Sequence, residues 1–136
     1  MNDSHRPTVL FLCVHNAGRS QMAAGWLSHL AGDSVEVLSG GSQPASAVNP
    51  DAVAAMLEVG IDISSSQPRP WTDADFGAAD VVVTMGCGDE CPYVPGKRYL
   101  DWELSDPSTM SLEGVRTVRD DIGRRVRQLV TELGTT

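Results

Sequence analysis

Short apolar runs alternate with helical patterns along the chain. Four runs predict strands: Thr8–Val14, Val35–Ser39, Asp80–Met85 and Lys97–Trp102. The first, TVLFLCV, has no polar alternation, which is typical of a strand buried on both faces of a parallel sheet. We expect the second strand to stop at the glycine pair 40–41, because consecutive glycines usually break a strand.

Helical spacing fills the segments between these runs. Apolar residues recur three and four positions apart over 19–30, and Asn49 is placed to cap a helix over 50–59. Thr72 is placed to cap a single helical turn that ends at Phe76. A long helix is predicted over 112–133. Strands that alternate with helices predict an open α/β domain with right-handed crossovers, in which ligands bind at the carboxyl ends of the strands.

The composition fits one domain that spans residues 1–136. The hydrophobic fraction of 41% and the charged fraction of 21% are ordinary for a globular protein. The apolar run 9–14 is shorter than a signal-peptide core or a membrane span, so we expect a cytoplasmic protein. In that reducing compartment, three cysteines indicate chemistry or metal binding before they indicate structural disulfides.

The net charge limits the choice of partners. At −8, the chain repels the phosphate backbone of nucleic acids and offers nothing to an anionic membrane surface. We therefore expect neither as a partner. A substrate that is itself an anion would need a local cluster of hydrogen-bond donors, because the field of the whole protein opposes its approach.

The segment from Cys13 to Ser20 provides such a cluster. It places a cysteine at the end of a predicted strand and Arg19 at the start of a predicted helix. Backbone N–H groups in a loop of this length, together with the helix dipole, form a cradle for a tetrahedral oxyanion, and the Arg19 guanidinium can hold two oxygens at once. The same donors stabilise a thiolate, so Cys13 is the expected nucleophile. The expected anion-binding residues are Val14, His15, Asn16, Ala17, Gly18, Arg19 and Ser20.

A simpler interpretation of this segment remains open. Cys13 could be a small buried residue that ends a strand, with Arg19 an ordinary surface residue on the next helix. The strand before the loop and the helix after it favour the catalytic interpretation. His15 could tune the loop electrostatically or be a turn residue without a role in catalysis.

The sequence CVHNAGRSQMAAG at 13–25 resembles the signature of the low-molecular-weight tyrosine phosphatases and their arsenate reductase relatives. The segments VNPDAVAAMLEVGIDIS at 48–64 and DVVVTM at 80–85, and the later Asp106-Pro107, follow the same family pattern in the same order. The resemblance implies a four-stranded parallel sheet flanked by helices. It also implies that Asp106 is the general acid that protonates the leaving oxygen. From the residues alone, Asp106 is as well explained as a turn-capping aspartate, and Asp101 and Glu103 are nearby alternatives.

Two further cysteines separate the two activities of this family. Both activities begin with attack by a thiolate, but a reductase then needs a second thiol, whereas a phosphatase needs only water. Cys87 and Cys91 follow the third predicted strand, and glycines on both sides of Cys87 give its backbone freedom to move. The resemblance to thioredoxin-coupled arsenate reductases implies a relay in which a disulfide passes from Cys13–Cys87 to Cys87–Cys91. The sequence does not decide which of the two attacks first.

The preferred hypothesis is therefore arsenate reduction, with phosphate or sulfate as competing oxyanions and with thioredoxin or a low-molecular-weight thiol as reductant. A phosphatase and a non-enzymatic oxyanion-binding module are the alternatives. No cofactor is expected, and two thiols without a second pair or a nearby histidine make a poor zinc site. Ala24 stands where some relatives have a glutamate linked to potassium binding, so no defined potassium site is predicted. No other metal site is expected either.

Overall fold

The predicted α/β architecture is confirmed in the computed structural model, which describes residues 6–85, 97–104 and 111–133. The strands are β1 (Thr8–Cys13), β2 (Glu36–Gly41), β3 (Val81–Thr84) and β4 (Arg98–Asp101). They form one sheet in the order β2-β1-β3-β4, and every neighbouring pair is parallel. The carboxyl ends of all four strands therefore lie at the same edge of the sheet.

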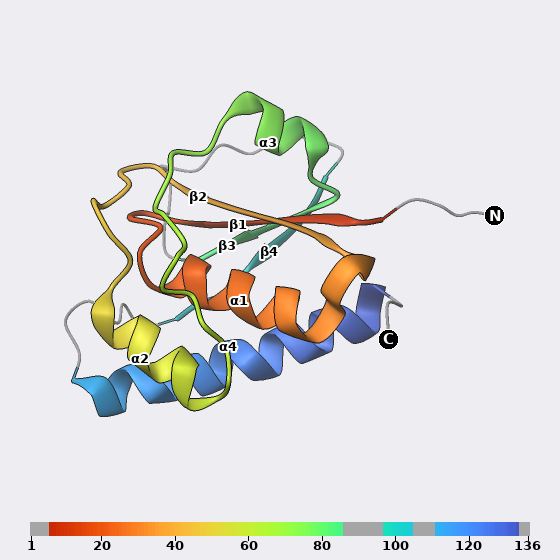
Figure 1. The fold of residues 1–136 in the computed structure, drawn as a ribbon. Coiled ribbons are helices and arrows are strands. Elements are labelled where there is room, and N and C mark those ends of the chain that lie inside the picture. The colour runs from red at the N-terminus through yellow and green to blue at the C-terminus, as the bar shows by residue number, and fades with distance from the viewer. Residues whose placement is uncertain (1–5, 86–96, 105–110, 134–136) are drawn as a thin grey trace.

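The helices are α1 (Arg19–Ala31), α2 (Pro50–Glu58), α3 (Asp73–Ala78) and α4 (Leu112–Leu133), with a short 3₁₀ turn, η1 (Gly32–Ser34), after α1. Helices α1, α2 and α4 cover one face of the sheet, and α3 lies on the other (Figure 1). The predicted caps are confirmed: Asn49 accepts a hydrogen bond from Asp51 N, and Thr72 and Asp75 form a capping box. None of the described helices is long and apolar enough to cross a membrane.

Strand β2 extends farther than the sequence predicts. The glycine pair 40–41 lies inside β2 and pairs with Leu12 and Cys13. A side chain at Gly40 would begin 2.9 Å from the backbone of Trp71, which crosses close to the strand there. The expected break at this pair was therefore wrong, because the glycines serve the close approach of two backbones rather than a turn.

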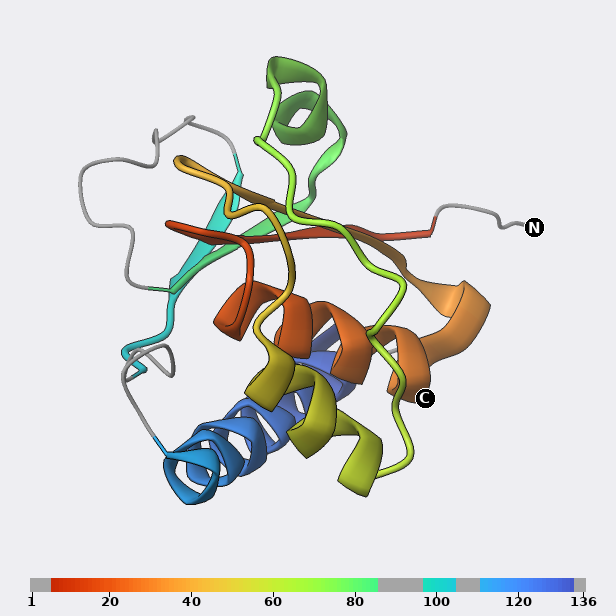
Figure 2. The ribbon, with the colours of Figure 1, turned by 60° about the vertical axis from the view of Figure 1, so that its left-hand side comes forward.

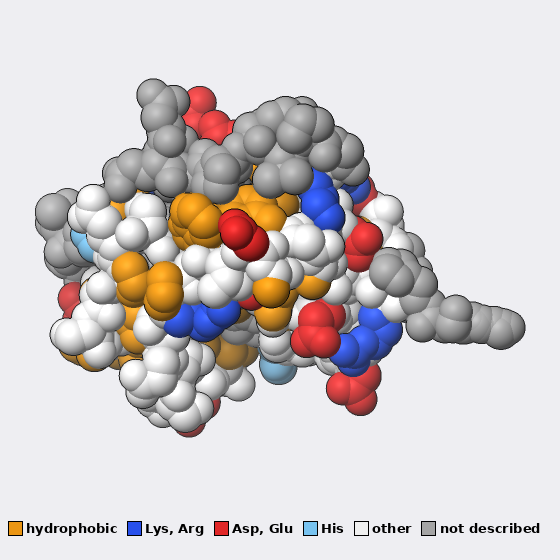
Figure 3. All heavy atoms as spheres, turned by 90° about the horizontal axis from the view of Figure 1, so that it is seen from above, with side chains coloured by type: hydrophobic (Ala, Val, Ile, Leu, Met, Phe, Trp, Pro, Cys, Tyr) orange, Lys and Arg blue, Asp and Glu red, His pale blue; other side chains and the backbone are white. Residues whose placement is uncertain are grey.

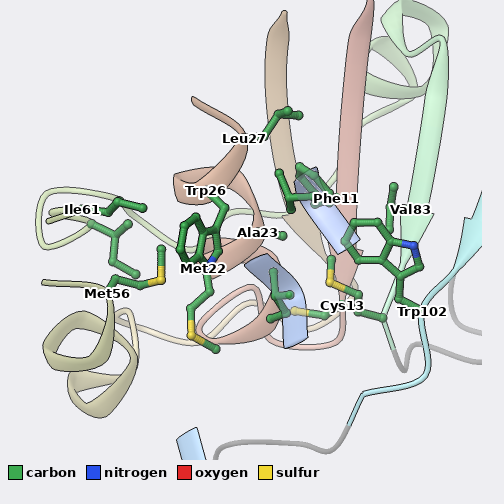
Figure 4. Packing of buried hydrophobic residues seen from close by; sticks show 14 of the residues in the cluster. Phe11, Cys13, Met22, Ala23, Trp26, Leu27, Met56, Ile61, Val83 and Trp102 are labelled. Atoms are coloured by element: carbon green, nitrogen blue, oxygen red, sulfur yellow. The ribbon is translucent and has the colours of Figure 1, made fainter. Parts of the chain in front are cut away.

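The core has two parts, one on each face of the sheet. Every residue of β1 is buried, as predicted, and its side chains alternate between the two parts. Cys13 falls with Phe11 in the larger part, under α1 and α4 (Figure 4). The smaller part lies under α3. The face of the molecule that carries α3 shows apolar side chains among charged and uncharged ones (Figure 3).

Arginine and glutamate side chains connect α2 to α4. Arg119, which is 9% exposed, donates from Nη1 to Ala55 O at 2.9 Å and to Glu58 Oε1 at 2.8 Å. Arg116 donates from Nη2 to Glu58 Oε2 at 2.7 Å. Hydrogen bonds from Arg116, and then from Arg119, lower the pKa of Glu58 from 4.5 to about 2.

We expect Glu58→Gln to lower the melting temperature near neutral pH and to have less effect in acid. A carboxyl group whose pKa is lower in the folded state stabilises that state above its unfolded pKa, near 4.5, and loses this effect as the pH falls to about 2. Melting curves of both proteins between pH 2 and 7 measure the difference. Asp33→Asn, at an exposed position in η1, is the control. A constant difference across this range would show that the Glu58 charge is not the cause.

Candidate active site

The candidate nucleophile lies at the carboxyl end of β1, where the chain turns into α1. Cys13 is the last residue of the strand and is 2% exposed, and α1 begins at Arg19. The N-cap of α1 is Gly18, which has no side chain that could cap the helix. The backbone N–H groups of the first turn are therefore not satisfied by a capping side chain, which suits a helix end that receives an anion.

The connection between β2 and α2 runs beside this loop (Figure 2). It also donates hydrogen bonds to carbonyl groups of the loop. The N–H groups of Gln43, Ala45 and Asn49 donate to the carbonyl oxygens of Val14, His15 and Ala17 at 2.8, 2.9 and 2.8 Å, respectively. Because none of the described peptide bonds is cis, the N–H of each of these peptide groups points away from its carbonyl. Asn16 N accordingly donates to Cys13 Sγ at 3.2 Å. This arrangement gives the N–H groups of the loop the inward direction that an oxyanion cradle requires.

Gly41 permits this close approach of β2 to the loop. A Cβ at this position would lie 2.6 Å from Val14 O and 3.0 Å from Asn16 N. Real Cβ atoms do not approach backbone oxygens to 2.6 Å, so any other residue here would displace the loop. The glycine is therefore part of the site, although it carries no reactive group.

Asn16 organises the interior of the loop. It is fully buried and has a φ of 50°, in the left-handed region that asparagine tolerates better than most residues. Its Oδ1 accepts from Arg69 N at 3.0 Å, and its Nδ2 donates to Ser20 Oγ at 2.7 Å. A backbone N–H can only donate, so Arg69 N determines which end of the Asn16 amide is the oxygen.

The direction of the next hydrogen bond follows from this assignment. Ser20 Oγ accepts from Asn16, so its own hydrogen is available for Cys13 Sγ, 2.9 Å away. The sulfur then has two donors, the Ser20 hydroxyl and Asn16 N. Both favour the negatively charged form of the thiol, because hydrogen bonds to a charged acceptor are stronger than those to a neutral one.

Arg19 is buried beside this network and is 8% exposed. Its Nη1 donates to Leu104 O at 3.4 Å, just after β4. This burial does not fit the interpretation of Arg19 as an ordinary surface residue. It places a guanidinium at the loop, where two oxygens of an anion can be held together.

The structure distinguishes the remaining predicted loop residues by exposure. Val14, Ala17 and Gly18 are partly exposed, whereas His15 is exposed and its role stays a prediction. Sequence reasoning missed Gln21, which is 4% exposed and donates from Nε2 to Asn16 O at 3.0 Å and to Gln67 O at 3.3 Å. A glutamine beside apolar residues in a helix carries no sequence signal of such a role.

Three predicted catalytic residues, Cys87, Cys91 and Asp106, lie outside the described residues. The elements that lead to them are described. Strand β3 pairs with β1, and Met85 N donates to Leu12 O at 2.8 Å, so the described chain reaches Met85 beside the end of β1. Of the alternative acids, Asp101 is exposed and its Oδ1 accepts from Thr84 Oγ1 at 2.9 Å.

Two surface cavities lie apart from the loop. One, of about 560 Å³, is lined by Ala24, Asp62 and other residues of α1, β2 and the segment after α2. The second, of about 440 Å³, lies between β4 and α4. Neither is lined by Cys13 or Arg19. Within the described ranges, no group of three histidine, cysteine, aspartate or glutamate residues is placed to hold a metal ion.

We expect Ser20→Ala to raise the pH at which alkylation of Cys13 reaches half its maximal rate by about 1–2 units, the effect of losing one hydrogen bond to a charged group. Alkylation followed by mass spectrometry at a series of pH values measures this midpoint. Ser28→Ala, on the exposed side of the same helix, is the matched control. Equal midpoints for the Ser20 variant and the wild type would contradict the donor role of Ser20.

Comparisons with known proteins agree with this geometry. A glutaredoxin arsenate reductase from Synechocystis sp. is 40% identical over 128 residues, which cover 92% of this chain and 97% of the relative. An arsenate reductase from Halalkalibacterium halodurans is 40% identical over 135 residues, which cover 90% of this chain and 94% of the relative.

Solved structures give the same result. A thioredoxin-dependent arsenate reductase from Corynebacterium glutamicum superposes with a TM-score of 0.81 at 48% identity; the match covers 94% of this chain but 61% of that one. An arginine phosphatase from Geobacillus stearothermophilus superposes with a TM-score of 0.85 at 26% identity, covering 95% of this chain and 94% of the other. The model of the low molecular weight phosphotyrosine protein phosphatase family matches residues 8–136, and the chain belongs to this family.

Proposed function

We propose that this protein is a cytoplasmic arsenate reductase and that residues 1–136 form its single domain. The observation that carries the proposal is the buried Cys13 sulfur, which has two hydrogen-bond donors and lies at the start of a loop whose carbonyl groups are turned outward. Such a loop recognises a tetrahedral oxyanion. The relatives named arsenate reductase, at about 40% identity over nearly the whole chain, support arsenate as that anion.

The first step is attack of the Cys13 thiolate on the arsenic atom of bound arsenate. A sulfur–arsenic bond forms, an arsenic–oxygen bond breaks, and the departing oxygen takes up a proton and leaves as water. Arg19 and the loop N–H groups hold the remaining oxygens throughout. Their positive charge and dipoles stabilise the negative charge that gathers on these oxygens in the transition state.

Asp106 is the proposed donor of the proton. Its position two residues after Leu104, whose carbonyl accepts from Arg19, supports this role, because a chain of two residues spans at most about 7 Å. Asp101 is less suited, since its carboxylate accepts a hydrogen bond from Thr84 in the sheet.

In the second step, the Cys87 thiol releases the arsenic adduct from Cys13. Hydrolysis of a phosphate adduct would use water instead. Cys87 attacks the Cys13 sulfur, a disulfide forms, and the electron pair of the broken sulfur–arsenic bond stays on arsenic, which leaves as arsenite. Cys91 then attacks Cys87 and frees Cys13, and an external dithiol reduces the Cys87–Cys91 disulfide. The pairing of β3 with β1 supports this assignment, since Cys87 follows Met85 by two residues.

The external reductant is proposed to be thioredoxin. The Corynebacterium glutamicum structure at 48% identity is described as thioredoxin-dependent, whereas the Synechocystis relative is named a glutaredoxin arsenate reductase. A low-molecular-weight thiol system is the alternative donor. Phosphate and sulfate should compete with arsenate, because the cradle recognises shape and charge.

Hydrolysis of phosphate monoesters is the second candidate function. The arginine phosphatase from Geobacillus stearothermophilus superposes on this chain over 95% of its length, so this fold also supports hydrolysis. Both activities use Cys13 as nucleophile and Arg19 to hold the anion. They differ only in whether a thiol or water releases the Cys13 adduct.

The relay predicts different outcomes for its two cysteines. Cys87→Ser should bind arsenate normally but lose turnover with thioredoxin, because no internal thiol can release the adduct. Cys91→Ser should trap a Cys13–Cys87 disulfide, which mass mapping after reaction with arsenate detects. Hydrolysis of an aryl phosphate, measured in parallel, should be the same in both variants as in the wild type. The relay would be overturned if both variants kept unchanged arsenate turnover with a protein reductant. A wild type that hydrolyses aryl phosphate but releases no arsenite would favour the phosphatase.

Replacement of the proposed acid should slow the first step and spare binding. Asp106→Asn is expected to reduce the rate of adduct formation by about 10²–10⁴, the usual contribution of a general acid. The affinity for phosphate should stay close to that of the wild type. Rapid-mixing measurement of a single turnover tests this, with Asp101→Asn and Glu103→Gln as matched variants. A larger loss in either of these would move the role to that residue.

A further inference from the structure

The segment 67–71 lies beside both the catalytic loop and the end of β2, and it is hydrogen-bonded to each of them. At its centre, both peptide groups of Arg69 are engaged: Arg69 N donates to Asn16 Oδ1 at 3.0 Å, and Arg69 O accepts from Gly41 N at 2.9 Å. Gly41 also forms an isolated parallel bridge with Pro70. The backbone of residue 69 is thereby fixed between the end of β2 and the buried Asn16.

The Arg69 side chain ties this segment to two other elements. Its Nη1 donates to Ser39 O in β2 at 2.7 Å, and its Nη2 donates to both carboxylate oxygens of Asp75 at 3.2 and 2.9 Å. The Asp75 side chain is 9% exposed and also accepts from Thr72 N at 2.8 Å, so α3 fixes its orientation. A carboxylate held in this way is a rigid anchor for the guanidinium.

These contacts form one connected path to the nucleophile. Asp75 and Ser39 hold the Arg69 side chain, and Arg69 N sets the orientation of the Asn16 amide. That orientation, in turn, makes Ser20 Oγ an acceptor from Asn16 and leaves its hydrogen for Cys13 Sγ. Asn16 Oδ1 accepts a second, longer hydrogen bond from Gln21 Nε2 at 3.3 Å. A shift of the Arg69 backbone would remove the shorter bond, loosen the Asn16 amide and so weaken the fixed donor direction of Ser20.

We propose that Arg69, anchored by Asp75, is a positioning residue that controls the reactivity of Cys13 through Asn16 and Ser20. The hydrogen bonds of Arg69 go to Asn16, Gly41, Ser39 and Asp75 and not to the sulfur, so its effect on the reaction is indirect. The inference deepens the proposed function, because it concerns the same nucleophile, but it holds for either activity of the loop. Its consequence is that an ion pair next to α3 supports the hydrogen bond between Ser20 Oγ and the Cys13 sulfur.

The test compares Arg69→Met with the matched variant Arg116→Met. The Arg116 side chain is 43% exposed, close to the 41% of Arg69, and pairs with Glu58 between α2 and α4, away from the loop. Arg69→Met should raise the pH midpoint of Cys13 alkylation by about 0.5–1 unit, less than deletion of a hydrogen bond to the charged sulfur, because the bond is loosened rather than removed. Arg116→Met should leave the midpoint unchanged.

Two further variants separate positioning from loss of structure. Asp75→Asn should raise the midpoint in the same direction, and the double variant with Arg69→Met should go no further than the larger single effect, because both act through one path. Arg69→Lys, which keeps the charge but lacks the fork that reaches both acceptors, should fall between the wild type and Arg69→Met. If Arg69→Met does not fold, the lysine and asparagine variants carry the test.

The outcomes are independent of arsenate turnover. Alkylation and its protection by phosphate are measured without a reductant. A raised midpoint in Arg69→Met would therefore support the role of Arg69 even if the wild type released no arsenite, a result that would overturn only the reductase. A folded Arg69→Met protein with the wild-type midpoint would overturn the inference. So would an equal shift in Arg116→Met, since the effect would then reflect general destabilisation.

Discussion

The orientation of the peptide groups between Cys13 and Arg19 is the constraint on which the site depends. A loop that turned carbonyl oxygens toward the sulfur would repel both a thiolate and an oxyanion. Here three of these carbonyl groups are bonded on the outside by N–H groups of the β2–α2 connection, so the partner N–H groups face inward. The connection contains none of the proposed catalytic residues, yet the cradle cannot keep its shape without it. Gly41 lets β2 lie close enough for these bonds to form.

The parallel sheet then brings the segments that carry the other proposed catalytic residues to the edge where Cys13 lies. Parallel strands deliver their carboxyl ends together, so the segments after β1, β3 and β4 all begin beside one another. The end of β1 supplies Cys13, β3 leads to the two other cysteines, and Leu104, after β4, contacts Arg19. One topological rule therefore relates a nucleophile, a proposed acid and a proposed thiol pair that are far apart in the sequence.

The sequence predicts functional residues that lie close together along the chain. It does not predict residues that meet only in the folded protein. Cys13 and Arg19 are separated by a fixed number of residues between a strand and a helix, so their pattern predicts the chemistry directly. Arg69 lies 53 positions from Asn16 and acts through a backbone N–H, which every residue except proline carries. Its role depends on where the segment before α3 crosses the loop, and no residue pattern encodes that crossing.

The glycine pair in β2 is a second case in which contacts distant in sequence decide the structure. Consecutive glycines have the same local signature whether they end a strand or admit a neighbouring backbone. At Gly40 the neighbour is Trp71, and at Gly41 it is the catalytic loop, both distant in sequence. Local propensity was therefore overruled by contacts that exist only after the chain has folded. The ends of the other three strands were predicted to within one residue.

The charge of the protein and the charge of its substrate are compatible because they act over different distances. A net charge of −8 is spread over the whole chain, and at physiological salt its field falls off within about 8 Å. The donors at Cys13 lie about 3 Å from the sulfur and are fixed in place, so they dominate the local potential. The acidic surface slows the approach of an anion without weakening the cradle that holds it. The same surface disfavours large polyanions, which must contact many residues at once, so a small oxyanion is the kind of anion that this protein can accept.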